Sequence, residues 1–148
     1  QPHPKSAILP LSQAASGGEL SRIMLALEVT LAGTKTVGAP GATRRTFVFD
    51  EVDAGIGGQA GIEVGRRLQA LSGDYQVIVV THLAQVAAFA QTQIQVEKVQ
   101  GHSKLRVLDA SQRREELARM ISGNKVTKTA LEHADELLRQ ANVGQFEA

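Results

Sequence analysis

Two short apolar runs constrain the fold of this chain more than any other feature of its sequence. Residues 46–49 and 76–80 are rich in β-branched and aromatic side chains and predict strands, and residues 59–71 between them predict a helix. A strand, a helix and a second strand at this spacing predict a right-handed βαβ unit with parallel strands. Both runs are continuously apolar, which is typical of parallel strands that are buried on both faces. The sequence therefore predicts an α/β fold.

An apolar helix is predicted ahead of the first strand. Residues 19–32 are apolar on nearly all sides, which is typical of a buried helix, and Gly33 follows as a stop signal. Residues 1–10 contain three of the four prolines and predict an extended lead-in, whereas residues 34–45 predict a polar loop. We expect a single domain over residues 11–148.

The second half of the chain predicts a hairpin and further helices. A short helix is expected over residues 83–90, and residues 93–99 then alternate between polar and apolar side chains. After a turn at 100–103, residues 104–109 predict the antiparallel partner strand. Two more helices are expected, over residues 115–121 and 127–141. Gly123 and Asn124 mark the break between them, and Gly144 marks the end of the second helix.

The composition excludes several classes of protein. With 148 residues, 43% of them hydrophobic, the chain can form one packed core, and the lack of cysteine excludes disulfides and thiolate metal sites. A formal net charge of +1 excludes a global basic field, and 3% aromatic residues argue against a base-stacking surface. The uncharged stretch 75–96 carries many Gln and Thr side chains, so we expect no membrane span. Without an apolar run at its start, we also expect no signal peptide and a cytoplasmic protein.

A glycine-rich turn lies at the start of the predicted apolar helix. It consists of Ser16, Gly17, Gly18 and Glu19. Free backbone amides and the helix dipole make such a helix start an anion site, and the glycines allow close approach of a phosphate. An ordinary capping box of Ser16 with Glu19 explains the turn equally well, and taken alone it is the more common explanation.

Polar side chains follow both predicted parallel strands. Asp50 and Glu51 come directly after the first strand, and Thr81 and His82 follow the second. Because the carboxyl ends of parallel strands meet at one edge of the sheet, these residues are expected to converge on a ligand crevice. Asp50 could there hold Mg²⁺ through water, Glu51 could polarise an attacking water, and His82 could contact a phosphate. Solvated charges and a satisfied histidine at strand ends are the alternative.

In this order the three motifs resemble the C-terminal lobe of an ABC-type P-loop ATPase head. The resemblance is closest to the SMC-like branch, which maintains chromosomes, and within it to the RecN family of bacterial repair proteins. It is carried by residues 16–22, 49–58 and 81–87, and it covers roughly residues 9–140. It implies parallel strands with flanking helices, a β-hairpin and C-terminal helices.

The resemblance implies a role for each matching residue. The Ser16–Glu19 turn corresponds to the signature loop, which in this family contacts the γ-phosphate of ATP bound to the opposite protomer. Asp50 corresponds to the Walker B aspartate that supports Mg²⁺, and Glu51 to the catalytic glutamate that orients water. The loop that begins at Asp53 corresponds to the dimer interface, and His82 corresponds to the switch histidine.

Two positions depart from the family pattern, and one motif is absent. Ala15 stands where the signature normally has Leu, and Gly57 stands where the interface loop normally ends in Asp. No G-x-x-x-x-G-K-[ST] phosphate loop is present in the chain. In this family that Walker A loop belongs to an N-terminal lobe beyond a long coiled coil. We therefore expect this chain to be inactive alone and to act as an Mg²⁺-dependent ATPase only in the complete protein.

The resemblance implies a part in DNA double-strand-break repair and recombination. Its implied cofactors are ATP and Mg²⁺, and its implied partners are its own N-terminal lobe and coiled coil, a second copy joined through an ATP sandwich, and DNA near the nucleoid. A non-catalytic lobe that binds protein or DNA is the alternative. The nucleotide subunit of a membrane transporter shares the motif order, but it normally has Pro where this chain has Val52. The arginine pairs at 44–45, 66–67 and 113–114 could face DNA, although such pairs are usually solvated.

Overall fold

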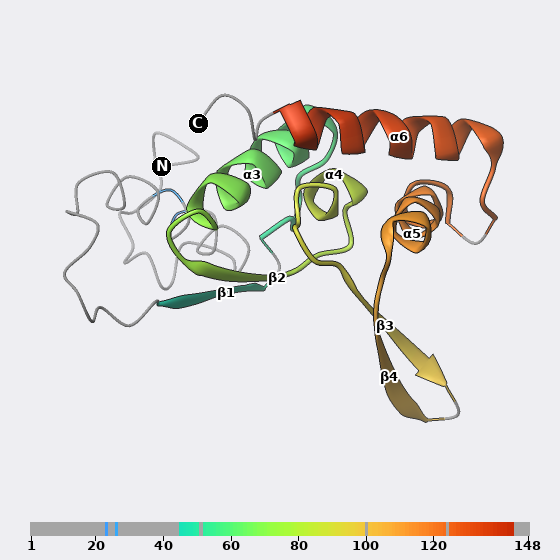
Figure 1. The fold of residues 1–148 in the computed structure, drawn as a ribbon, viewed down its shortest axis with the longest axis horizontal. Coiled ribbons are helices and arrows are strands. Elements are labelled where there is room, and N and C mark those ends of the chain that lie inside the picture. Colours follow the sequence, from blue (N-terminus) through green and yellow to red (C-terminus); the bar gives the residue numbers. More distant parts are fainter. Residues whose placement is uncertain are drawn as a thin grey trace, which may run out of the picture.

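The computed structural model describes residues 23, 26, 45–50, 52–99, 101–123 and 125–143 of the chain. Its named elements follow one another along the chain as seen in Figure 1: β1 (Thr46–Asp50), α3 (Gly58–Leu71), β2 (Gln76–Val80), α4 (Ala84–Ala87), β3 (Ile94–Val99), β4 (His102–Val107), α5 (Ala110–Ser122) and α6 (Lys128–Val143). Of the apolar helix predicted over residues 19–32, only Ile23 and Ala26 are described, and both are helical.

The predicted βαβ unit is confirmed. Strands β1 and β2 pair in parallel, with Thr46 opposite Gln76 and Asp50 opposite Val80, and α3 connects them. The β-branched and aromatic residues of both strands suit an extended backbone. The two strands therefore end at the same level of the sheet.

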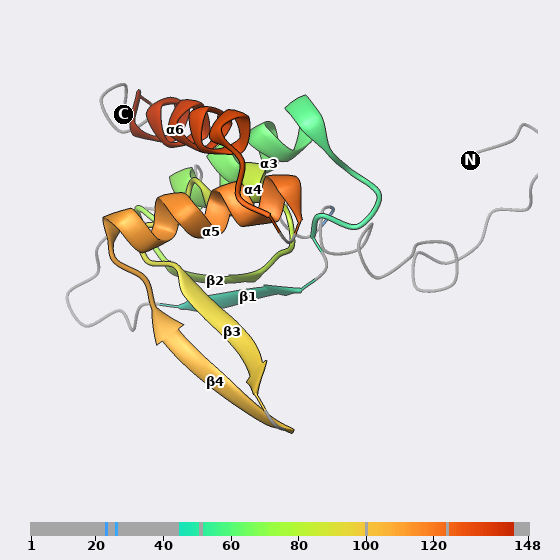
Figure 2. The same cartoon turned by 90° about the vertical axis from the view of Figure 1, so that its right-hand side faces the viewer.

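Among the residues that the structure describes, helices cover one face of this two-stranded sheet, and the expected burial of the second face stays a prediction. Phe49 packs in a core with Val52, Leu68, Leu71 and Val86, so this face lies against α3 and α4. The alternate residues point the other way, and Val48 remains 66% exposed. Figure 2 shows all the labelled helices on one side of β1 and β2. The continuous apolar pattern predicts two buried faces, whereas the described part of the chain supplies a cover for one.

Helices α3 and α4 approach each other closely because α3 presents glycines to α4. A Cβ atom built on Gly61 would lie 3.1 Å from Cβ of Gln85, and one on Gly65 would lie 2.5 Å from Cδ2 of Phe89. Helix α4 itself is shorter than the predicted 83–90 and covers only Ala84–Ala87. The glycines thus let a short helix sit directly against α3.

Small side chains dominate the second core, where α4, α5 and α6 meet. Seven of its ten buried residues are alanines, and Phe89, Leu117 and Leu137 are the large ones. Helix α5 begins at Ala110, five residues before the predicted start at 115. Its start is set by a capping box, in which the Asp109 side chain accepts from the Gln112 amide and the Gln112 side chain accepts from the Asp109 amide. The last helix, predicted over 127–141, agrees closely with α6.

The predicted antiparallel hairpin is formed by β3 and β4, which begins at His102 rather than at 104. Figure 2 shows the hairpin extending away from the helices. One face carries the paired apolar residues Ile94 with Val107 and Val96 with Leu105, all of them exposed. We call these four residues the hairpin apolar face.

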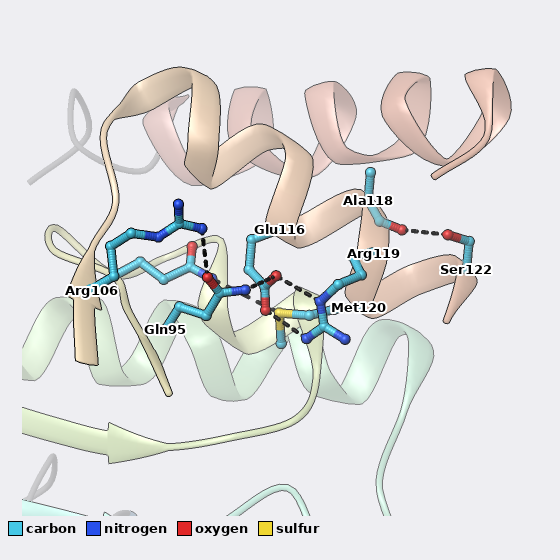
Figure 3. Close-up of polar contacts among 8 residues, drawn as sticks. Gln95, Arg106, Glu116, Ala118, Arg119, Met120 and Ser122 are labelled. Atoms are coloured by element: carbon cyan, nitrogen blue, oxygen red, sulfur yellow. Dashed lines mark hydrogen bonds and ion pairs between the residues drawn. The ribbon is translucent and has the colours of Figure 1, made fainter. Parts of the chain in front are cut away.

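The opposite face of the hairpin is tied to α5 by polar contacts (Figure 3). Gln95 donates from Nε2 to Glu116 at 2.7 Å and accepts from Arg106 at 2.8 Å. Glu116 also accepts two hydrogen bonds from Arg119, which raise the pKa of Arg119. These four polar side chains thus form one connected network, which fixes the base of the hairpin on α5.

No helix among the described residues is long and apolar enough to cross a membrane.

Candidate functional site

The carboxyl ends of β1 and β2 bring predicted site residues to one edge of the sheet. Asp50 is the last residue of β1 and lies opposite Val80, so Thr81 and His82 leave the sheet at the level of Asp50. Asp50 is exposed at this edge. A carboxylate oxygen in such a place suits Mg²⁺, which takes oxygen ligands and usually keeps several waters. This edge therefore offers one carboxylate of the kind that a hard cation binds.

The chain after β1 turns sharply at this edge. Val52 is fully buried and anchors the segment, and a turn follows in which the Ile56 amide donates to the Asp53 carbonyl at 3.2 Å. Gly55 occupies the third position of this turn with φ of +70°, a left-handed conformation that favours glycine. The turn directs Asp53 inward and leaves Gly55 and Gly57 exposed.

The Asp53 carboxylate collects four polar contacts from the segment after β2. Its Oδ2 accepts from the Thr81 hydroxyl, from the His82 amide at 2.9 Å and from the Leu83 amide at 3.3 Å. The same oxygen lies 3.2 Å from Nδ1 of His82. Asp53 is only 2% exposed. One buried carboxylate thus joins the loop after β1 to the loop after β2.

The ionisation of Asp53 follows from these contacts. Burial is the largest single influence and raises the pKa of this carboxyl, because a buried charge loses its hydration. The Thr81 hydroxyl, the His82 amide and the charge of His82 act in the opposite direction and together prevail, so the pKa of Asp53 lies below its ordinary 3.8. Asp53 is therefore a carboxylate at neutral pH.

His82 combines a fixed backbone with an accessible ring. Its amide donates to Asp53, and Leu83 next to it is the N-cap of α4. The ring is 77% exposed, although its Nδ1 lies beside the Asp53 carboxylate. His82 therefore presents an exposed imidazole at the same edge as Asp50.

Arg113 of α5 holds the far end of α4. Its guanidinium donates to the carbonyls of Ala87, Ala88 and Ala90, which lie at the end of this short helix. Burial lowers the pKa of Arg113, because the charge is partly removed from water. A cation at a helix C-terminus is favoured by the free carbonyls and the helix dipole. The segment that carries His82 is thus anchored at both ends.

The structure brings together three of the predicted site residues, namely Asp50, Asp53 and His82. Ser16, Gly17, Gly18, Glu19 and Glu51 lie outside the described residues. Among the described residues no group of three or more metal-binding side chains is found. Sequence reasoning gave no separate role to Thr81 or Arg113, because nothing local marks the partner of a residue far away along the chain.

Three arginines of the predicted pairs, Arg67, Arg113 and Arg114, have structural partners. Arg67 pairs with Glu63 at 3.1 Å, and Arg114 forms two hydrogen bonds with Asp135 of α6. Those bonds raise the pKa of Arg114 and lower the pKa of Asp135. The pair at 113–114 therefore joins helices to one another.

Comparison with known proteins shows which proteins this chain is similar to. No family model matches the chain. The chain is 50% identical to the DNA repair protein RecN of Streptomyces coelicolor over 144 residues, which is 95% of this chain and 24% of that protein. It is 48% identical to RecN of Mycobacterium tuberculosis over 94% of this chain and 23% of that protein. RecN of Deinococcus radiodurans is 49% identical over 92% of this chain and 23% of that protein. The chain thus spans about a quarter of the length of the curated relatives it matches.

A solved structure supports the same resemblance at the level of the fold. It comes from work on ATP-driven dimerization and DNA-stimulated activation of SMC ATPases, and it matches with a TM-score of 0.51 and 26% identity. The match covers 76% of this chain and 65% of that one. The similarity to RecN and the α/β fold of an SMC-like head lobe are confirmed.

Proposed function

We propose that this chain is the C-terminal lobe of the ATP-binding and ATP-hydrolysing head of a RecN-like DNA repair protein. The observation that supports the proposal is the parallel register of β1 and β2, in which Asp50 lies opposite Val80, two residues before His82. The curated relatives are named as DNA repair proteins, and the solved neighbour is an SMC ATPase. The complete protein would use ATP and Mg²⁺ there.

Each residue at the edge has a distinct task in this proposal. Asp50 supports Mg²⁺ through water, and Glu51 next to it orients the water that attacks the γ-phosphate. The exposed His82 ring contacts the γ-phosphate. The Ser16–Glu19 turn closes over the nucleotide of the opposite protomer, so that ATP joins two heads. Asp53 begins the loop that lies at this dimer interface, with Gly55 and Gly57 as its exposed part.

The exposed apolar surfaces give the lobe a place to meet the rest of the head. The sheet face that the described residues leave open carries Val48, and the hairpin apolar face carries Leu105 at 68% exposure. Apolar patches of this kind mark interaction sites. We assign them to the N-terminal lobe, which would supply the Walker A loop. The isolated chain should therefore be inactive and prone to self-association.

The test is Mg²⁺-dependent ATP hydrolysis by the complete protein that contains this segment, measured beside the isolated chain, with and without linear DNA. We expect turnover by the complete protein alone, with DNA stimulating it. Glu51→Gln should bind ATP and hydrolyse it on the order of a hundredfold more slowly, because the attacking water loses its orienting base. Glu132→Gln, at an exposed position of α6, is the matched control and should keep its turnover.

Two outcomes would contradict the proposal. Wild-type turnover by Glu51→Gln would remove Glu51 from the reaction. A complete protein that neither binds nor hydrolyses ATP would instead favour a lobe that binds protein or DNA without chemistry, for which the exposed hairpin apolar face is the supporting observation.

A further inference from the structure

A single buried carboxylate reaches from the loop after β1 to the backbone that carries His82. Asp53 Oδ2 binds the Thr81 hydroxyl and the amides of His82 and Leu83, and it lies 3.2 Å from Nδ1 of His82. We infer that Asp53 is a positioning residue, which fixes the backbone and ring of His82 so that the ring is presented at the sheet edge. The reaction that His82 serves rests on the proposed function, but the positioning contact does not.

The burial of Asp53 argues against a direct role at an interface or a metal. At 2% exposure its side chain offers almost no surface to a partner protomer. Its Oδ2 is surrounded by donors, all from residues 81–83. A buried carboxylate is stable only when such donors replace its hydration. The buried Asp53 carboxylate therefore needs the donors of residues 81–83, and their conformation in turn is held by the carboxylate.

The contacts act on the backbone and the ring of His82 separately. The hydrogen bond from the His82 amide to Asp53, at 2.9 Å, holds the main chain. The Leu83 amide also donates to Thr81 Oγ1 at 3.0 Å, so the main chain is held as far as the start of α4. Nδ1 lies 3.2 Å from the same carboxylate oxygen, which favours this orientation of the ring. In an imidazole with Nδ1 turned to the carboxylate, Nε2 lies on the opposite side of the ring. Nε2 is therefore the atom offered to a ligand.

The experiment removes the carboxylate in the complete protein and asks whether its effect passes through His82. Asp53→Asn keeps the shape of the side chain and removes its charge. We expect turnover to fall on the order of 100-fold, because a small displacement of a reacting group has effects of this size. ATP affinity should stay unchanged. Asp74→Asn, an exposed carboxylate in the turn after α3, is the matched control and should keep full turnover.

A double-mutant cycle separates positioning from general stability. In a His82→Ala background, Asp53→Asn should lower turnover no further, because the residue through which it acts is gone. An equal loss in both backgrounds would overturn the inference.

Thr81→Ser and Thr81→Val form a second pair of variants, since Ser keeps the hydroxyl that binds Asp53. We expect Ser to keep turnover and Val to lower it, and equal behaviour of the two would also overturn the inference.

Amide hydrogen exchange tests the contact without any catalysis. In Asp53→Asn the amides of His82 and Leu83 should exchange faster, while amides of α6 stay unchanged. If the complete wild-type protein did not hydrolyse ATP but these amides still responded, the proposed function would fail and the positioning contact would stand. Unchanged exchange at both amides would overturn the positioning contact itself.

Discussion

Gly65 is the position where a single methyl group is expected to disturb this fold most. A Cβ at residue 65 would lie 2.5 Å from Phe89 Cδ2 and 3.0 Å from the backbone oxygen of Gln85. An ordinary carbon contact is about 3.5 Å, so α3 and α4 would have to separate by roughly 1 Å. Phe89 is 3% exposed and cannot turn away into solvent. Even if Phe89 moved, the close contact of the new Cβ with the backbone oxygen of Gln85 would remain.

The expected cost of Gly65→Ala combines two opposing effects. Overpacking a closed core costs about 1 to 3 kcal/mol, and the backbone contact places this site at the upper end. Alanine gains about 1 kcal/mol over glycine in a helix interior. The net loss is about 2 kcal/mol, which corresponds to roughly 30-fold faster amide exchange for helices that open locally.

The assay is hydrogen exchange measured by mass spectrometry on the complete protein, for peptides from α3 and α4. Ala60→Gly, on the exposed face of α3, is the control for helix propensity and should also accelerate exchange, by about fivefold, the equivalent of about 1 kcal/mol. Slower or unchanged exchange in Gly65→Ala would refute the close approach of α3 and α4, since only the favourable propensity would then remain.

Three other predictions concern contacts described above. Because the pKa of Asp53 is lowered on folding, its stabilising effect is complete well above pH 3.8 and is lost as the pH falls below that value; the protection of the His82 amide, measured as its exchange rate relative to the intrinsic rate at each pH, should fall there in the wild type and change less in Asp53→Asn. Arg113→Met should release the end of α4 and accelerate exchange at Ala90, whereas Arg66→Met on exposed α3 should not. Leu105→Asp should reduce self-association of the isolated chain in sedimentation, and an unchanged sedimentation profile would exclude the hairpin apolar face as its cause.

The parallel strands could be predicted from the sequence because their signal is local. Continuous apolar runs at 46–49 and 76–80 need only neighbouring residues to be recognised, and their order implies the crossover. The predicted start of α5 is five residues too late, because it relies on apolar periodicity. Residues 110–114 are mostly polar, and the capping box of Asp109 with Gln112 was not recognised as a helix start.

The candidate site could be predicted only in part, because its contacts join distant residues. The motif order identified Asp50 and His82, and the strand register then placed them at one edge. The contact of Asp53 with Thr81 spans 28 residues and depends on that register, so no local pattern reports it. The resemblance assigned the loop at Asp53 to an interface, and only the burial of its side chain points to a role inside the lobe.

The alanine-rich core between α4, α5 and α6 makes tolerance to mutation one-sided. Its alanines, such as Ala118 and Ala134, are fully buried, so the distance between helices is set by backbone contact rather than by long side chains. Trimming these residues removes only a methyl group, whereas any enlargement pushes whole helices apart. Variation in this region should therefore be limited by side-chain size even among apolar residues, in addition to the exclusion of buried charge. A library of substitutions would show a steep dependence on side-chain volume here and a shallow one on the exposed hairpin.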